Sequence, residues 1–289
     1  MYSLQGTFPS RKKIVNPMPD EPAQVVAQVV ANAYNNLGAE FDAMVEKTPF
    51  LINCTLLYNH CLEAFTKGPP LLRVLDVGCG SGVQSMHLAP YAKEVVGIDL
   101  SENLIEIAKE RCKQYQNARF QVGDACQLPF PDQSFDFIIS YGDVLSHIVE
   151  RYKEAVSEMA RVAKSGARIT FEVDTKWNFG IFYHPKELMD ALAVPGIGHA
   201  TREWEGMRFK TFTYCEIKSL LDENKLEIVS CRGHNILASL IPDRFLLEKG
   251  ERTMIGKLAL FLGRLDLFLS GRYPFNRFGF NFIITAKKR

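Results

Sequence analysis

An apolar run from Leu71 to Val77 that ends directly in a glycine-rich turn constrains the fold of this chain more than any other feature. Residues 78–82 read Gly-Cys-Gly-Ser-Gly and lead into a helical pattern. Glycines at such a turn let the backbone bend tightly and approach a ligand, since a Cβ would collide with it. This order of strand, glycine turn and helix predicts the first unit of a parallel α/β sheet, with a ligand beyond the carboxyl end of the strand.

The chain downstream continues as short apolar runs that alternate with amphipathic stretches, which is typical of a parallel sheet covered by helices on both faces. We expect seven strands, the last of them antiparallel, at 71–77, 94–98, 119–122, 135–140, 167–173, 227–231 and 278–286. We expect helices at about 81–88, 102–114, 152–162 and 213–224.

Two helices are expected before the first strand. Asp20 can cap one that ends near Gly38, and Thr48 with Pro49 can begin another that runs to Phe65. Residues 1–68 therefore form an N-terminal helical cap and residues 69–289 the main domain. Segments at about 175–212 and 233–275 are too long for ordinary connections and are expected to be functional insertions.

Composition narrows the class of protein. The 289 residues are 47% hydrophobic and 23% charged, which is enough for a large buried core, and a net charge of +1 gives no support for nucleic-acid binding. The seven cysteines include no CxxC pair, so we expect reduced thiols and no metal site. Residues 1–19 carry Arg11-Lys12-Lys13 without an apolar core, so neither a signal peptide nor a membrane anchor is expected. These features favour a cytoplasmic protein.

Two carboxylates follow the second and third expected strands. Asp99 comes about 17 residues after the glycine turn, where it can accept hydrogen bonds from ribose hydroxyls. Asp124, in Gly123-Asp124-Ala125, can accept one from the exocyclic amine of adenine. Further motifs read Asp-Gln-Ser-Phe-Asp at 132–136 and Ser-Tyr-Gly-Asp at 140–143.

With these motifs the chain resembles the class I (Rossmann-like) S-adenosylmethionine (SAM)-dependent methyltransferase family, particularly the ubiquinone/menaquinone-type and small-molecule methyltransferases. The resemblance covers about Leu71 to Val173 and implies SAM as cofactor and S-adenosylhomocysteine (SAH) as product. It implies cofactor-binding roles for Asp76, Gly78, Cys79 and Gly80 at the methionine part, Asp99 and Leu100 at the ribose and adenine, Asp124 and Ala125 at the adenine, and Ser140 near the methionyl end.

A nicotinamide or flavin dinucleotide is the rival ligand, because it uses a glycine turn at the same place. The spacing argues against it: Gly78, Gly80 and Gly82 form GxGxG, and Val83 occupies the position of the third glycine in GxGxxG. The turn therefore favours a nucleoside without a pyrophosphate.

Residues 34–42 are similar to a Tyr-Asp…Tyr-Asp segment that closes over SAM in many family members. Asn35 and Phe41 depart from that pattern, so Tyr34 alone is carried over as a cofactor-binding residue. The alternative is that these aromatic residues only pack helices together.

Methyl transfer from a sulfonium mainly requires alignment of the nucleophile and, where needed, removal of its proton. We expect a small-molecule acceptor with an N- or O-nucleophile. His147, just beyond the fourth strand, is the candidate base, or else it caps the next helix or binds Asp143. Tyr141 and Asp143 can position the substrate or act on a proton. Second-line candidates, without metal-site spacing, are His184, His199 and His234.

The second insertion carries a wide apolar helical face between Met254 and Leu269, with Lys257 and Arg264 on another side. It can contact a lipid surface or an apolar substrate, or it can pack over the sheet edge or form a homodimer contact. Its length and charges exclude a transmembrane span. Two alternative functions stay open: a methyltransferase for prenyl-quinones or other lipids, and a SAM-binding protein without turnover.

Overall fold

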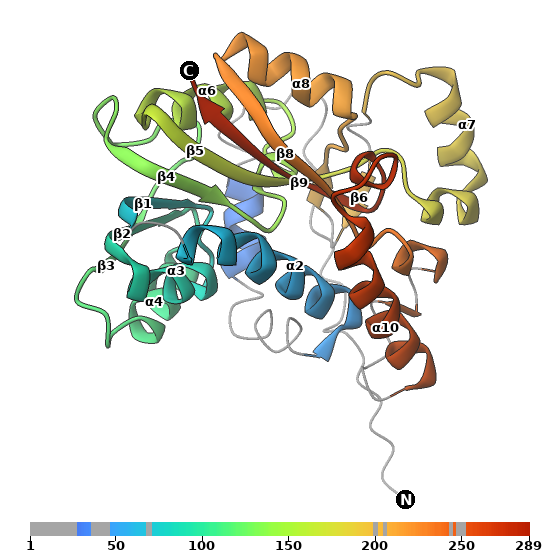
Figure 1. Ribbon diagram of the computed structural model, residues 1–289, viewed down its shortest axis with the longest axis horizontal. Coiled ribbons are helices and arrows are strands. Elements are labelled where there is room, and N and C mark those ends of the chain that lie inside the picture. The colour runs from blue at the N-terminus through green and yellow to red at the C-terminus, as the bar shows by residue number, and fades with distance from the viewer. Residues whose placement is uncertain are drawn as a thin grey trace, which may run out of the picture.

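The computed structural model describes residues 28–35, 47–67, 71–198, 202–204, 207–242, 245–246 and 253–289, with one seven-stranded sheet at its centre (Figure 1). The strand order is β3-β2-β1-β4-β5-β9-β8. The strands are β1 (Leu71–Val77), β2 (Ala92–Asp99), β3 (Ala118–Val122), β4 (Phe135–Ser140), β5 (Ala163–Asp174), β8 (Leu226–His234) and β9 (Asn281–Lys288).

The first five strands are parallel, and β9 runs antiparallel to both β5 and β8. The expected α/β fold with an antiparallel last strand is therefore confirmed. The chain adds β2 and β3 on one side of β1 and then crosses over to add β4 and β5 on the other side. Such a reversal opens a crevice at the carboxyl ends of the strands, where α/β sheets bind their ligands.

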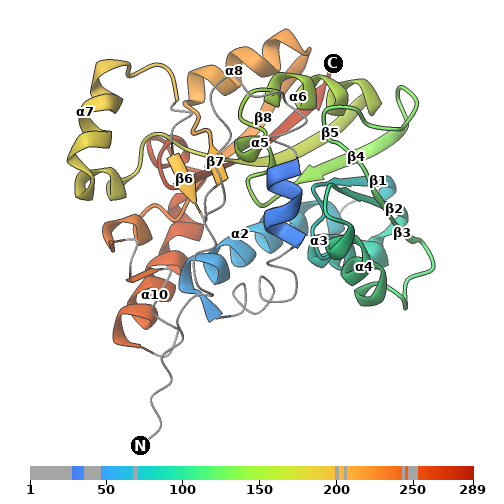
Figure 2. The same ribbon diagram turned by 180° about the vertical axis from the view of Figure 1, so that it is seen from behind.

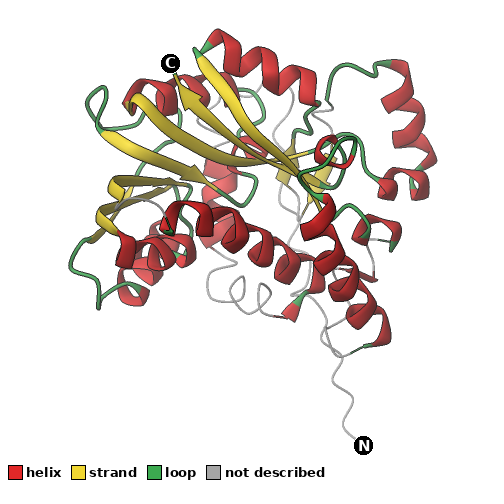
Figure 3. Cartoon of the chain, viewed as in Figure 1, coloured by secondary structure: helices red, strands yellow, loops and turns green. Residues whose placement is uncertain are grey.

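Helices cover both faces of the sheet, as Figures 2 and 3 show from opposite sides. They are α2 (Pro49–Thr66), α3 (Val83–Leu88), α4 (Glu102–Arg111), α5 (Val144–His147), α6 (Tyr152–Val162), α7 (Pro185–Ala193), α8 (Tyr214–Glu223) and α10 (Met254–Leu269), and residues 28–35 are also helical. Within the described ranges, no helix combines the length and apolarity that a membrane crossing needs.

The strand sequences form this sheet because their apolar residues point to both faces. In β1, Leu75 belongs to a core with α6 and α8, whereas Val74 belongs to a second core with α2. In β4, Ile138 and Phe137 divide between the same two cores, and both are at most 1% exposed. Since α2 shares a core with the sheet, this part of the expected N-terminal cap packs as an integral layer of the fold.

Local signals set several helix ends as expected. Thr48 is the N-cap of α2 and Pro49 its first residue, although the Thr48 side chain makes no capping hydrogen bond. Of the helix expected from Asp20 to Gly38, only 28–35 lies within the described residues, where it is helical. The expected strand at 167–173 is wrong at its start, because pairing with β4 already begins at Ala163.

Both expected insertions contain secondary structure, of which only the helix with the apolar face between Met254 and Leu269 was expected from the sequence. The first holds η2 (Phe179–Tyr183), α7 and an antiparallel pair, β6 (Arg202–Trp204) and β7 (Met207–Phe209). The second holds η3 (Ala238–Leu240), α10 and η4 (Phe275–Arg277). The two insertions contact each other through η2 and η3, and α10 packs against α2.

Candidate functional site

The glycine turn between β1 and α3 lies at the crevice. Gly78, Gly80 and Gly82 have φ angles of 70°, 50° and 80°, a conformation that side chains disfavour. A Cβ at Gly78 would lie 2.3 Å from Val144 Cγ2 and one at Gly82 2.9 Å from Ala108 Cβ. A Cβ at Gly80 would meet no heavy atom of the described residues within 4 Å. Two of these glycines thus serve packing, and Gly80 borders open space where a ligand can approach the backbone.

Asp99 ends β2 and holds the glycine turn in place. Its Oδ2 accepts a hydrogen bond from the backbone N–H of Gly80 at 2.9 Å, and its Oδ1 accepts one from Ser101 at 2.9 Å. Burial raises the pKa of Asp99, against the lowering effect of these N–H groups and that of Leu100. A carboxylate has about four acceptor positions. Asp99 therefore keeps acceptor capacity for hydroxyl groups beside Leu100.

Asp76 lies inside β1, two residues before Gly78, and is 2% exposed. Its Oδ2 accepts a hydrogen bond from the Ser85 hydroxyl of α3 at 2.7 Å. Burial raises the pKa of Asp76 to about 7, with Ser85 opposing the shift and Asp99 adding to it. A cation bound nearby would favour the ionised form. Burial also raises the pKa of the neighbouring Cys79 thiol, which leaves it unreactive.

Asp124 follows β3 and is fixed by two partners. Its Oδ1 accepts a hydrogen bond from the backbone N–H of Cys126 at 2.8 Å, and its Oδ2 pairs with Arg151 at 3.0 Å. Arg151 had no role in the sequence analysis, and only the folded chain brings it to this loop. The carboxylate is thus oriented beside Ala125, which is 8% exposed.

The helical residues 28–35 join two loops at the crevice. The Tyr34 hydroxyl lies 3.3 Å from Nε2 of His147, with the rings edge to face. Asn35 Oδ1 accepts a hydrogen bond from the Ser101 hydroxyl at 2.6 Å, and the Asn35 carbonyl accepts one from Asn103. This segment therefore links the loop after β2 to α5, which follows β4. Although Asn35 departs from the family pattern, its hydrogen bonds attach this segment to the loop after β2.

His147 is the last residue of α5 and faces Tyr34. Burial lowers the pKa of His147 to about 4, so the ring is neutral near pH 7. Its Nδ1 has no hydrogen-bond partner among the described residues. The Asp143 carboxylate accepts a hydrogen bond from Asn281 Nδ2 at 2.7 Å. His147 binds Asp143 through the backbone alone, since its N–H donates to the Asp143 carbonyl at 3.1 Å while its ring faces Tyr34.

A buried polar cluster beside the crevice joins the sequence candidates Tyr141 and His234 to two residues that the sequence did not suggest, Tyr58 and Glu172. Glu172 of β5 is fully buried and accepts hydrogen bonds from the Tyr58 hydroxyl of α2 and from the backbone N–H of Gly142. Nδ1 of His234, at the end of β8, lies 3.2 Å from its other oxygen. The Tyr58 ring stacks on Tyr141 with centroids 4.6 Å apart. The cluster thus connects α2 to the loop after β4.

Several polar atoms of this region have no partner among the described residues. They are Ser140 Oγ, Tyr141 Oη and His234 Nε2. Buried polar atoms of folded proteins are nearly always hydrogen-bonded, to the protein, to water or to a ligand. These three buried atoms therefore keep hydrogen-bonding capacity for water or a polar ligand near the carboxyl ends of β4 and β8.

Three carboxylates converge on the same edge of the sheet. Glu172 and Asp174 lie within the last three residues of β5, and Asp143 follows β4 with a left-handed φ of 57°. Burial raises the pKa of Asp143, and the charges of Asp174 and Glu172 raise it further. A signal for this group existed in the sequence, because each acid lies at or just past the end of an apolar strand.

One group within the described residues has metal-ligand chemistry. Ligand atoms of Cys54, Glu172 and His234 lie within 4.8 Å of one another, and all three residues are buried. Burial raises the pKa of the Cys54 thiol, and Glu172 and His234 already bind each other. The protein atoms therefore form a hydrogen-bonded group, and a soft divalent ion would have to displace the thiol proton.

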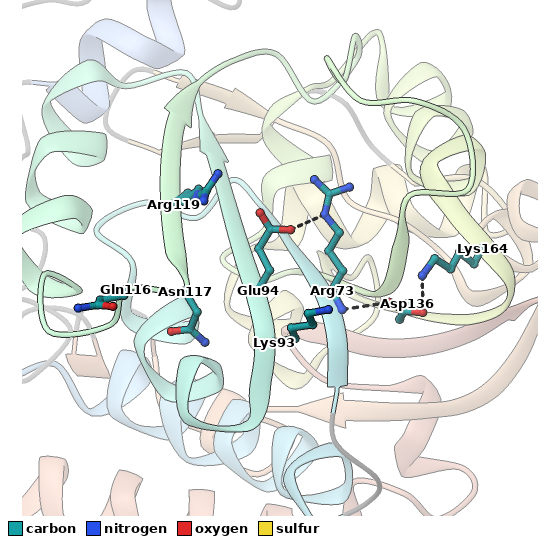
Figure 4. A pocket seen from close by; sticks show the side chains of 8 residues that line it. All are labelled: Arg73, Lys93, Glu94, Gln116, Asn117, Arg119, Asp136 and Lys164. Carbon is teal, nitrogen blue, oxygen red and sulfur yellow. Dashed lines mark hydrogen bonds and ion pairs between the residues drawn. The ribbon is translucent and has the colours of Figure 1, made fainter.

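A cavity of about 600 Å³ lies at the opposite edge of the sheet (Figure 4). It is lined by residues at the amino ends of β1 to β5, and ion pairs cross it between Arg73 and Glu94 and between Lys164 and Asp136. Because ligands of α/β sheets bind at the carboxyl ends, this cavity is separate from the candidate site.

Comparisons with known proteins identify the family of the chain. The family model described as "Methyltransferase domain" matches residues 74–166. The chain is 33% identical over 139 residues to the uncharacterized methyltransferase YcgJ of Bacillus subtilis, a match that covers 43% of this chain and 53% of that protein. It is 31% identical over 175 residues to the demethylmenaquinone methyltransferase of Staphylococcus haemolyticus, covering 56% of this chain and 72% of the relative.

A solved structure shares the fold over most of the chain. The magnesium protoporphyrin IX methyltransferase of Synechocystis, with bound SAH, superposes with a TM-score of 0.59 at 19% identity, covering 91% of this chain and 99% of that one. The chain belongs to the SAM-dependent methyltransferase family. The family expected from the glycine turn and the two carboxylates is thereby confirmed, menaquinone-type relatives included.

Proposed function

We propose that this protein transfers a methyl group from SAM to an N- or O-nucleophile of a small-molecule acceptor and releases SAH. The observation that carries the proposal is the glycine turn: Gly80 faces open space, and Asp99 holds its backbone N–H at the carboxyl end of β1. No cofactor other than SAM is needed for this reaction, because the sulfonium is itself an activated leaving group.

The cofactor site follows from the positions of the carboxylates around that turn. Asp76 is suited to the methionyl ammonium, because a cation would stabilise its ionised form. Asp99 keeps acceptor capacity for the ribose, and Asp124 is oriented toward the adenine position. The remaining proposed cofactor contacts are Tyr34, Gly78, Cys79, Leu100, Ala125 and Ser140.

The acceptor is proposed to bind beside the loop after β4, near Tyr141 and Asp143. Free polar atoms at Ser140, Tyr141 and His234 suit a nitrogen or oxygen nucleophile. A cationic sulfonium bound beside Asp143 would favour the ionised form of this buried acid, so the acidic edge of the sheet suits SAM. His147 is neutral and can accept a proton from the acceptor, with Tyr34 orienting its ring.

A lipid acceptor is the second candidate. The demethylmenaquinone methyltransferase of S. haemolyticus is named for a prenylated quinone, and large apolar side chains of both insertions are exposed, among them Phe182 and Phe261. An acceptor with a long apolar chain would bury such side chains. A SAM-binding role without turnover remains the third alternative.

Location, organisation and partners complete the proposal. We place the protein in the cytoplasm, with residues 1–68 as a helical cap on a methyltransferase domain that carries two insertions. A homodimer and a peripheral membrane contact are compatible with the exposed apolar surface. Nucleic acid is not proposed as a substrate, since the net charge is only +1.

Two measurements test the proposal together. Calorimetry with SAH tests the cofactor site, and methyl-labelled SAM incubated with small-molecule and prenyl-quinone acceptors tests turnover through SAH release. SAH binding with SAH release supports methyl transfer, and the productive acceptor decides between the first two candidates. SAH binding without release on any acceptor would favour a binding role, and no SAH binding would refute the cofactor site.

A further inference from the structure

The outward side of α10 is an unusual surface. Five large apolar residues follow one another at spacings of four and three positions and are 42–81% exposed. They are Met254, Leu258, Phe261, Leu265 and Phe268, hereafter the α10 outer face. At about 100° per residue, this spacing puts all five on one stripe along the helix. Large exposed apolar patches mark interaction sites more often than inert surface.

The opposite side of α10 fixes this orientation. Gly256, Ala259, Gly263 and Asp266 are buried there. Asn53 of α2 donates a hydrogen bond to the Ala259 carbonyl at 3.1 Å, and a Cβ at Gly263 would lie 2.1 Å from Asn53 Cγ. Small residues are thus required against α2, so the helix cannot turn its large apolar side chains inward. The sequence left open whether the apolar face packs onto the fold; in the structure Ile255 and Leu262 pack beside Ala259, whereas the α10 outer face is exposed.

Within the described residues 253–289, the exposed charged side chains beside the α10 outer face are basic. Lys257 and Arg264 are exposed along one flank of the stripe, and Arg272 follows the helix with its guanidinium 3.6 Å from the centroid of the Phe268 ring. Asp266 is the only acidic residue between positions 253 and 289. It is buried and accepts a hydrogen bond from the Leu237 N–H at 2.9 Å. The surface is therefore apolar with a cationic border.

Further apolar side chains are exposed at the same end of the molecule. Met189 and Leu192 of α7 are 71% and 61% exposed, and α7 and α10 lie at one end of the ribbon in both Figures 1 and 2. The Tyr183 hydroxyl donates to the Leu240 carbonyl and so ties the first insertion to η3, which contacts α10. Both insertions thus contribute to an exposed apolar end.

We propose that the α10 outer face docks on the surface of an anionic lipid bilayer, with the helix lying in the interface plane. The apolar stripe would enter the acyl boundary, and the long side chains of Lys257, Arg264 and Arg272 would reach the lipid phosphates. A second copy of this chain fits less well, since two such faces would bring cationic borders together. The inference goes beyond methyl transfer and does not depend on the acceptor.

Vesicle sedimentation tests the lipid assignment directly. The full-length protein should bind vesicles of phosphatidylcholine and phosphatidylglycerol in equal parts at least about tenfold more tightly than vesicles of phosphatidylcholine alone, because each cation near an anionic surface adds to binding. Added salt should weaken the binding, as it screens these charges.

Paired variants separate the apolar and the cationic contributions. Leu258→Asp with Phe261→Asp should lower binding to anionic vesicles at least about tenfold. The matched control replaces Tyr91 and Val229, which are 46% and 54% exposed in other elements, by Asp and should bind like the wild type.

The cationic contribution is tested by charge reversal, again with a control pair of exposed basic residues elsewhere on the protein. Lys257→Glu with Arg264→Glu should weaken anionic binding about tenfold or more, whereas the same reversal at exposed Lys109 and Lys153 should leave most of it. Unchanged thermal unfolding shows that each variant is folded, and this readout holds even if SAH does not bind. Absence of vesicle binding by the wild type would overturn the proposal. So would a lipid-free dimer that the Leu258 and Phe261 substitutions dissociate, since a second copy would then occupy the face.

Discussion

Asp99→Ala is the perturbation that tests the cofactor site most directly. The carboxylate has two tasks in the structure, because it accepts the N–H groups of Gly80 and Ser101 and keeps acceptor positions toward the proposed ribose. Alanine removes both. The variant therefore changes the free energy of unfolding as well as SAH affinity, and the two effects have to be measured separately.

The magnitudes follow from the hydrogen bonds involved. A bond to a charged acceptor contributes about 1.5–3 kcal/mol, so loss of the ribose contact should weaken SAH binding about 10- to 150-fold. The backbone N–H groups of Gly80 and Ser101 lose their acceptors in the free protein, although water can reach the crevice. We expect a loss of about 1–3 kcal/mol in the free energy of unfolding.

Calorimetry with two ligands separates ribose binding from support of the turn. Wild type and Asp99→Ala are titrated with SAH and with its 2′,3′-dideoxy analogue, which lacks the ribose hydroxyls. If Asp99 binds the ribose, the variant loses affinity for SAH and little for the analogue. Equal losses for both ligands would mean that Asp99 only holds the turn, and unchanged SAH affinity in a folded variant would refute the assignment altogether.

Three further predictions address the turn, the buried acid and the candidate base. Gly80→Val should abolish SAH binding, because the valine side chain enters the space of the ligand. The control is Gly166→Val, which has a left-handed φ of 79° but lies far from the crevice. It should strain the backbone and leave SAH affinity intact. Burial raises the pKa of Asp76 from 3.8 to about 7, so between these pH values the folded state retains a proton that the unfolded state releases. In the free protein, the free energy of unfolding of Asp76→Asn relative to that of the wild type should therefore rise by at most about 4 kcal/mol from pH 3.8 to pH 7. Denaturant titrations that show no such rise would contradict the burial argument. Because the pKa of His147 is lowered to about 4, turnover should lack an inflection near pH 6.5 from this ring, and an inflection there that His147→Gln removes would show that the ring titrates normally.

The strand pattern of the first half could be predicted because each strand is a short apolar run bounded by polar turns. The ends of β4 and α6 were located to the residue. The start of β5 was placed too late, since Lys164, Ser165 and Gly166 interrupt its apolar run although the backbone already follows β4 with a register shift. The β6–β7 pair could not be predicted, because strands of three residues are too short to show an alternating apolar pattern.

The residues proposed for the cofactor could be named from the sequence, and those proposed for the acceptor only in part, since Tyr141 and Asp143 were named but Glu172 was not. Gly80 and Asp99 follow the strands that place them, so local pattern was sufficient. Tyr58, Glu172 and His234 form one buried cluster although 114 and 62 positions separate Tyr58 and His234 from Glu172. The sheet order, with β9 between β5 and β8, places His234 near Glu172, and the packing of α2 on the sheet adds Tyr58; no local pattern encodes either arrangement.

Helix α2 connects the two surfaces to which function is assigned. Its Tyr58 hydroxyl binds Glu172, which in turn binds the backbone of Gly142 in the proposed acceptor loop. Five residues earlier in the same helix, Asn53 donates a hydrogen bond to the Ala259 carbonyl of α10. The proposed bilayer contact and the proposed acceptor site thus share one rigid element of 18 residues. An acceptor that partitions into the bilayer would therefore meet the protein at the end where both insertions expose their apolar side chains.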